Sequence, residues 1–111
     1  MIKPVRNDLQ CYKGQTFIQP ILFERSKHPW PLSGLAAKAE IRPSENSTKL
    51  IAEMTATVYD ADGLIELYLN SGQTAALEPG FYTWDLKTTD EHGDVIPWLY
   101  GQFIVTGRTT V

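Results

Sequence analysis

The chain has 111 residues, of which 42% are hydrophobic and 21% charged, and its formal net charge is −3. This length predicts a single domain over residues 1–111 with a core of its own, and the composition excludes an intrinsically disordered chain. A negative net charge offers no general attraction for phosphate backbones or anionic lipids, so we expect neither nucleic acid nor a membrane as a partner. No apolar run reaches the length of a signal peptide or a membrane span, which predicts a soluble protein made in a cytoplasm.

Apolar residues recur at a spacing of two almost throughout the chain, and turn residues interrupt them at short intervals. This pattern predicts an all-β sandwich or barrel. The first strand is expected over residues 8–13 and ends at Gly14. Residues 1–7 and 108–111 are expected to be extended termini.

The second strand is expected within residues 15–26. Its alternation predicts an inner face made of Phe17, Ile21 and Phe23, and an outer face that includes Ile18 and Leu22. Pro20 has no N–H to donate to a neighbouring strand. We therefore expect this strand to lie at an edge of the sheet or to be interrupted by a bulge.

A turn bounded by prolines follows over residues 27–34, in which Pro29 and Pro31 restrict the backbone and Gly34 tolerates a positive φ. The next strand, residues 35–42, alternates small apolar residues with charged ones. The residues expected to face the core are Ala37, Ala39 and Ile41, and those expected to face water are Lys38, Glu40 and Arg42.

Two further strands are expected on either side of a tight turn at residues 60–63. In the second of them, residues 64–69, the inner face consists of Ile65, Leu67 and Leu69, and the outer face of Leu64, Glu66 and Tyr68. The only helical signal is a single turn near residues 72–77, for which Ser71 is the expected N-cap.

The last two strands, residues 80–90 and 95–107, have the clearest alternation and predict a long hairpin. The inner face of the first is expected to carry Tyr82, Trp84, Leu86 and Thr88, with Phe81, Thr83, Asp85 and Lys87 outside. The inner face of the second is expected to carry Leu99, Gly101, Phe103 and Val105. Trp98 and Tyr100 alternate with this set and are therefore expected to point outward.

Residues with catalytic or metal-binding chemistry are few and widely separated. His28 and His92 lie in different turns, and neither has a second histidine or a cysteine at ligand spacing. The acidic turns around Asp60 and Asp90 lack the ligand spacing of a calcium loop, so we interpret them as solvated turns. The single cysteine, Cys11, is expected to be a small buried hydrophobe. With no nucleophile motif and no glycine-rich phosphate loop, the sequence predicts a non-enzymatic protein without catalytic residues, metal site or cofactor.

Function is then expected to reside in surfaces, and the large aromatic residues are the candidates. If Trp98 and Tyr100 both point outward, they form an anchor for protein contact, and packing beneath a loop is the alternative. Trp30, with Pro31 beside it in an exposed turn, is a second candidate surface, whose ring would suit stacking on a glycan.

The order of these segments resembles a family of small Ig-like β-sandwich domains of tailed bacteriophages and prophages. The resemblance covers about residues 8–107 and rests on GQTF, PLSGLAAKAEIR, LIELYLNSGQTAAL and EPGFYTWDLKTTDEHGDVIPWLYGQFIVTG. Its most specific parts are LSG at 32–34 with Ile41 and Arg42, TAAL at 74–77, and GFY at 80–82 with Asp85, Leu86 and Gly101. The chain departs from the family pattern at HPWP, residues 28–31, where such domains more often have a simple Asp-Gly turn.

The resemblance implies a single Ig-like antiparallel β-sandwich of about seven strands. It also implies a structural virion protein of the tail, baseplate or neck, present in several copies and bound to other phage structural proteins. No catalytic residue comes with it. Decoration of the capsid surface, a host-glycan-binding module, and an intracellular phage or host regulatory protein remain as alternatives.

Overall fold

The structure, a computed structural model, describes residues 4–25, 28–29, 34–44 and 46–107. This part of the chain is all-β, with ten strands, one short α-helix and one 3-10 turn. The strands are β1 (Val5–Arg6), β2 (Leu9–Tyr12), β3 (Phe17–Leu22), β4 (Glu24–Arg25), β5 (His28–Pro29), β6 (Ala36–Arg42), β7 (Ala52–Tyr59), β8 (Leu64–Leu69), β9 (Gly80–Thr89) and β10 (Val95–Thr106). The helix α1 spans Ser71–Ala75, and the 3-10 turn spans Asp60–Asp62.

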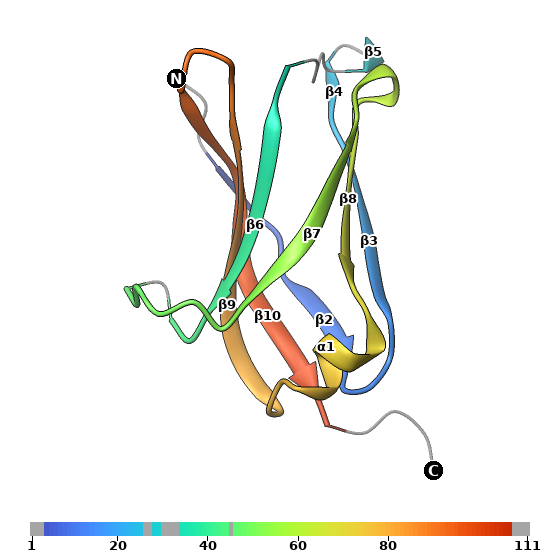
Figure 1. Cartoon of the computed structure of the whole chain (residues 1–111), viewed down its shortest axis with the longest axis vertical. Coiled ribbons are helices and arrows are strands. Elements are labelled where there is room, and N and C mark those ends of the chain that lie inside the picture. The colour runs from blue at the N-terminus through green and yellow to red at the C-terminus, as the bar shows by residue number, and fades with distance from the viewer. Residues whose placement is uncertain (1–3, 26–27, 30–33, 45, 108–111) are drawn as a thin grey trace.

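Eight of these strands form one mixed sheet in the order β1-β10-β9-β6-β7-β8-β3, with β2 also paired to β10. Strand β7 pairs with β6 through residues 52–54 and with β8 through residues 55–59. The sheet curls at β7, so that β8 and β3 face the half formed by β6, β9 and β10 (Figure 1). The two-residue strands β4 and β5 pair with each other.

Strands β1 and β2 depart from the antiparallel arrangement expected from the sequence. Both run parallel to β10, where β1 lies opposite Leu99 and Tyr100 and β2 lies opposite residues 103–106. The expectation of an entirely antiparallel fold is therefore wrong. Residues 5 and 6, which were expected to belong to an extended terminus, form part of the sheet. Parallel pairing joins segments that are far apart in the sequence, so local spacing does not reveal it.

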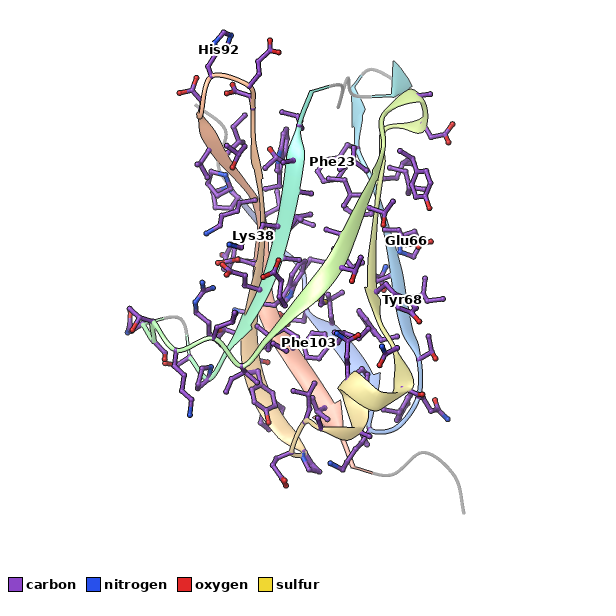
Figure 2. All side chains as sticks on the ribbon, in the orientation of Figure 1. Phe23, Lys38, Glu66, Tyr68, His92 and Phe103 are labelled. Carbon is purple, nitrogen blue, oxygen red and sulfur yellow. The ribbon has the colours of Figure 1, made fainter. Side chains whose placement is uncertain are left out.

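The core fills the space between the two halves of the sheet. The ring of Phe17 on β3 lies edge-on to the ring of Phe103 on β10, with centroids 5.4 Å apart. Figure 2 shows Phe23 and Phe103 between the halves, whereas Glu66 and Tyr68 point away from them. The inner faces predicted from alternation for β3, β6, β8 and β9 are confirmed. The buried apolar residues are Leu9, Cys11, Phe17, Ile21, Phe23, Ala39, Ile41, Met54, Ile65, Leu67, Leu69, Leu77, Trp84, Leu86, Trp98, Phe103 and Val105.

Strand β3 is an edge strand, since within the described residues it pairs only with β8. Just beyond it, the N–H of Phe23 donates to the carbonyl of Gly63 at 2.7 Å. Antiparallel residues alternate in the side to which they bond, so Ile21 also bonds toward β8, whereas Pro20 directs its backbone to the free edge. The missing N–H of Pro20 thus breaks no bond of the ladder. The register through β3 continues without a bulge.

Helix α1 begins after Asn70, which is its N-cap in place of the predicted Ser71. The Asn70 side chain accepts a bond from the N–H of Gln73, and the Gln73 side chain accepts one from the N–H of Asn70, both at 2.8 Å. This reciprocal pair satisfies two backbone donors that the helix itself leaves unbonded. The fully buried Thr74 ties the helix to the β2–β3 connection, because its hydroxyl accepts from the N–H of Gly14 and donates to the carbonyl of Gln15.

Between β1 and β2 the chain turns a corner that rests on Gly101 of β10. The N–H of Asn7 donates to the carbonyl of Tyr100, and the indole Nε1 of Trp84 donates to the carbonyl of Asn7, both at 2.8 Å. A Cβ at position 101 would overlap the Asn7 carbonyl oxygen and lie 2.8 Å from the carboxylate of Asp8. Only glycine therefore allows the corner to approach β10 so closely.

The next residue of the corner, Asp8, completes the hydrogen bonding of β10. Its carboxylate accepts the N–H of Gln102 at 2.9 Å, in place of a backbone carbonyl of a paired strand. This bond lowers the pKa of Asp8, and the neighbouring Arg6 guanidinium lowers it further. A side chain thus satisfies the one β10 donor that lies between β1 and β2.

We predict that Gly101→Ala will lower the free energy of unfolding by about 1–3 kcal/mol, because the added methyl group forces the corner away from β10. Gly72→Ala is the matched control. Its Cβ would meet only the Asn70 Oδ1 atom, at 3.4 Å, and alanine favours the helical conformation. Urea unfolding followed by circular dichroism measures both variants. Equal stabilities for the two would contradict this account of the corner.

Candidate protein interface

Trp98, the first of the predicted interface residues, is buried rather than outward-facing. The pairing of β10 with β9 shifts register between Pro97 and Leu99, which makes Trp98 the extra residue of a β-bulge. The extra residue breaks the strict alternation on which the sequence prediction depended. Trp98 is 9% exposed, and Leu99 beside it also packs against the core.

Contacts with Thr88 and Phe23, among the described residues, hold the Trp98 side chain inside. Its indole Nε1 donates to the hydroxyl of Thr88 at 2.8 Å, and its ring lies edge-on to Phe23 with centroids 5.1 Å apart. The polar edge of the ring is satisfied and its apolar faces are packed, as is usual for a buried tryptophan. The prediction that Trp98 and Tyr100 form an exposed pair is therefore wrong.

Tyr100 is exposed, as predicted, with 42% of its surface accessible. It lies on the outer face of β10, opposite Asp85 of β9. The other two predicted interface residues, Trp30 and Pro31, lie outside the described residues. Of the four candidates, the structure thus leaves Tyr100 on a described surface.

A larger apolar surface lies on the other half of the sheet, over β3, β8 and β7. Its members, which we call the apolar outer strip, are Ile18, Leu22, Tyr59, Leu64 and Tyr68. Ile18 lies opposite Tyr68, while Leu22 lies opposite Leu64, which in turn lies opposite Tyr59. Side chains at such opposed positions are in contact range, so the strip consists of two apolar groups, with Pro20 and Glu66 in the row between them. Ile18 and Leu22 remain 55% and 58% exposed.

The signal for this strip was present in the sequence. Alternation placed apolar residues on both faces of the segments that form β3 and β8. A strand with apolar residues on both faces is usually covered on both faces by other parts of the protein or by a partner. The sequence did not show that the two strands are neighbours. The pairing in space brings these apolar residues into two groups on the same outer face.

The outer face of β6 and β9 has the opposite character and carries a compact group of charges. Glu40, predicted to face water, is almost entirely buried, with its carboxylate 2.6 Å from the Arg42 guanidinium. The ammonium groups of Lys87 and Lys38 lie 3.5 and 3.8 Å from the same carboxylate. Burial alone raises the pKa of Glu40, but the bond and charge of Arg42, together with the two lysines, lower it overall.

Asp85 lies beside Glu40 across the β6–β9 pairing. Its Oδ2 is 3.5 Å from Arg42, whereas its Oδ1 is buried without a hydrogen-bond donor among the described residues. Burial raises the pKa of Asp85, and the attraction of Arg42 and Lys87 does not offset it. The two neighbouring carboxyl groups therefore have pKa shifts in opposite directions.

A concave surface that encloses a volume of about 730 Å³ lies outside β9 and β10, next to this charged group. Its lining includes Arg6, Arg42, Ser44, Ser47, Phe81, Thr83, Asp85, Tyr100 and Gln102. Phe81, predicted to point outward, is 71% exposed at one end of this surface. The volume lies within the range of small-molecule sites, about 300–1,000 Å³.

The described part of the chain contains no group of three or more histidine, cysteine, aspartate or glutamate residues placed to hold a metal ion. Cys11 is a free, buried cysteine, as predicted, and burial raises the pKa of its thiol. Among the described helices, none has the length and apolar character needed to cross a membrane.

No protein-family model and no curated protein matches the chain. Solved structures do match, among them the Siglec domain of GspB, with a TM-score of 0.54 and 15% identity over 94% of this chain. The chain spans 56% of the length of that chain. At this identity the likeness concerns the fold alone. In all, 117 chains of solved structures match, and a shared fold does not by itself indicate a function.

We predict that Trp98→Ala will lower the free energy of unfolding by about 3–5 kcal/mol, because it removes a buried ring and leaves a cavity. Tyr100→Ala, the control on the same strand, will lower it by about 1 kcal/mol or less, since that ring is exposed. Thermal and urea unfolding measure both. Similar losses for the two variants would show that the bulge does not place Trp98 in the core.

The opposite pKa shifts of Glu40 and Asp85 predict opposite effects on stability. A lowered pKa in the folded state stabilises the fold at neutral pH, and this contribution disappears as the pH falls through the folded pKa. A carboxyl group whose pKa is raised in the folded state destabilises the fold at pH values above that folded-state pKa. We therefore expect Glu40→Gln to lower the free energy of unfolding at neutral pH by about 1–3 kcal/mol, as it leaves three cations without their shared partner.

Asp85→Asn is the matched variant, and we expect it to leave stability at neutral pH unchanged or raised. Unfolding by urea at neutral pH and in acid, below the usual glutamate pKa of about 4.3, measures both variants. The difference between Glu40→Gln and the parent chain should shrink in acid. Equal losses for Glu40→Gln and Asp85→Asn at neutral pH would refute the assignment.

Proposed function

We propose that this chain is a structural, non-enzymatic protein of a tailed bacteriophage particle, made in the host cytoplasm and located in the tail, baseplate or neck. The observation that carries the proposal is the apolar outer strip, two groups of apolar side chains on the outside of the curled sheet. Such surfaces are typical of protein–protein interfaces, in which a few buried apolar and aromatic anchors supply most of the binding energy. The phage context comes from the sequence resemblance.

The finer description of the fold that belongs to this proposal is an Ig-like β-sandwich. Two features support it: the two facing halves of the curled sheet and the core packed between them. In this arrangement the inner faces are fully used for stability, and the outer faces are free to meet partners. The partners proposed here are other phage structural proteins and further copies of this chain.

Several copies are expected, because phage particles are built with rotational symmetry and repeat the same contact around an axis. Each copy needs to bury roughly 800 Å² for a stable contact of standard size. Ile18, Leu22 and Tyr59, spread over β3 and β7, provide anchors for such a contact. Tyr100, on the other half of the sheet, is available for a second contact.

The first test is mass spectrometry of density-banded particles from the source strain. We expect peptides of this chain in stoichiometric amounts relative to other tail proteins. Separation of tails from heads then distinguishes the tail, baseplate or neck from decoration of the capsid. Absence of the chain from particles whose other tail proteins are well covered would overturn the proposal in favour of a role inside the infected cell.

We predict that replacing Ile18 and Leu22 together by serine will reduce incorporation into particles several-fold, with only a small change in thermal stability, because both side chains are already exposed. Val95→Ser is the matched control, since Val95 is also 55% exposed but lies on β10, away from the strip. Quantitative mass spectrometry of particles assembled with each variant gives the comparison. Unchanged incorporation of the double variant would remove the strip as the contact surface.

A further inference from the structure

The concave surface outside β9 and β10 carries chemistry that a protein contact through the apolar outer strip does not use. Its floor is formed by residues that lie side by side across the strands, since Thr83 lies opposite both Gln102 and Arg42. The ends carry aromatic rings, Phe81 at one end and Tyr100 at the other. Both rings are substantially exposed, so neither is needed to fill the core.

The spacing of the two rings sets the size of the ligand. Phe81 lies four residues from Asp85, which is the residue opposite Tyr100. Four residues of a strand span about 13 Å at about 3.3 Å per residue. This distance exceeds the width of one sugar ring or one aromatic ring. A ligand that contacts both Phe81 and Tyr100 is therefore an elongated molecule.

The polar groups between the rings suit hydroxyl groups. The Thr83 hydroxyl donates to the carbonyl of Arg42 at 3.4 Å, which leaves its oxygen lone pairs free to accept. The side-chain amide of Gln102 both donates and accepts, and its backbone N–H is already bound by Asp8. Asp85 adds a carboxylate whose Oδ1 has no donor within the described residues. Rotation of that half-exposed carboxylate brings either oxygen to the surface.

The charges of the site argue for an uncharged ligand. Both arginines of the lining already have carboxylate partners: Arg6 lies 3.2 Å from Asp8, and Arg42 lies between Glu40 and Asp85. An anionic ligand would have to compete with these carboxylates and would be repelled by Asp85. A neutral polyol meets no such penalty, because its hydroxyl groups bond to neutral and charged partners alike.

We propose that this surface binds a neutral oligosaccharide of two or more rings. The C–H edges of the sugar rings lie on the negative faces of Phe81 and Tyr100, and the hydroxyl groups bond to Thr83, Gln102 and Asp85. This activity goes beyond the structural role proposed above, which requires no ligand. It also places glycan recognition at a surface made of described residues.

The test uses the purified chain on an array of neutral and anionic oligosaccharides and monosaccharides. We expect signals from neutral oligosaccharides and weaker ones from the corresponding monosaccharides. The tightest-binding neutral oligosaccharide is then titrated against the parent chain and its variants by calorimetry. No signal from any neutral oligosaccharide, or signals from anionic ones alone, overturns the proposal.

The variants locate the site. Phe81→Ala and Tyr100→Ala should each weaken binding roughly two- to tenfold, the loss expected for one aromatic contact. Tyr59→Ala is the matched control. The exposed fraction of Tyr59, 43%, is close to that of Tyr100, 42%, but Tyr59 belongs to the apolar outer strip. Unchanged binding in both concave-surface variants, or an equal loss in Tyr59→Ala, overturns the assignment. Incorporation into particles is measured separately, so a failure here leaves the proposed structural role standing.

Discussion

The constraint on which the rest of the structure depends is the pairing of β10 along both of its edges. One edge bonds to β9, and the other bonds to β1 and β2 from the opposite end of the chain. Because β10 has neighbours on both edges, it is adapted to the core by a local break in register and by the size of its side chains. The bulge at Trp98, the absent side chain at Gly101 and the ring of Phe103 are three such adaptations, placed along one strand. Each meets a different partner: Phe23, the β1–β2 corner and Phe17.

The two outer faces of the molecule differ in how their side chains are satisfied. Over β6 and β9, Glu40 gathers three cations around one buried carboxylate, so the charge of Glu40 is balanced within the chain. Over β3, β8 and β7, the apolar outer strip obtains no such compensation from the described residues. A partner that covers the second face gains apolar contact, whereas one that covers the first must also match a set of fixed charges. The two faces therefore suit different kinds of ligand.

Much of the fold could be predicted from the sequence, because alternation reports local geometry directly. The inward positions of Ile65, Leu67 and Leu69, and of Trp84, followed from a spacing of two. The same rule failed at Trp98, where one extra residue reverses the face on which the next side chain lies. Pro97 beside it was the only local hint, since proline in a strand often accompanies a bulge. The strand predicted at residues 8–13 is confirmed as β2, but the parallel pairing of β1 and β2 with β10 could not be predicted, because it joins the two ends of the chain and leaves no local pattern.

The candidate surfaces were predictable in part. Tyr100 and Phe81 were placed outward by alternation, and the structure agrees. Their union in one concavity with Ser44 and Ser47 depends on the path of the segment after β6 and on the corner before β2, which spacing alone does not specify. The apolar outer strip likewise depends on which strands become neighbours. In both cases the sequence shows which types of residue point outward, whereas the fold determines which of these residues become neighbours.

The proline of β3 has a consequence for any particle that holds many copies. The free edge of a sheet is a template on which a second chain can continue the hydrogen-bonded ladder, and crowding favours that reaction. Pro20 leaves this edge without its central donor, so a second copy gains an incomplete ladder there. Copies of the chain would therefore gain less from backbone pairing at this edge than from contacts between side chains on their faces. A single imino acid thus weakens this edge as a template for open-ended fibre growth.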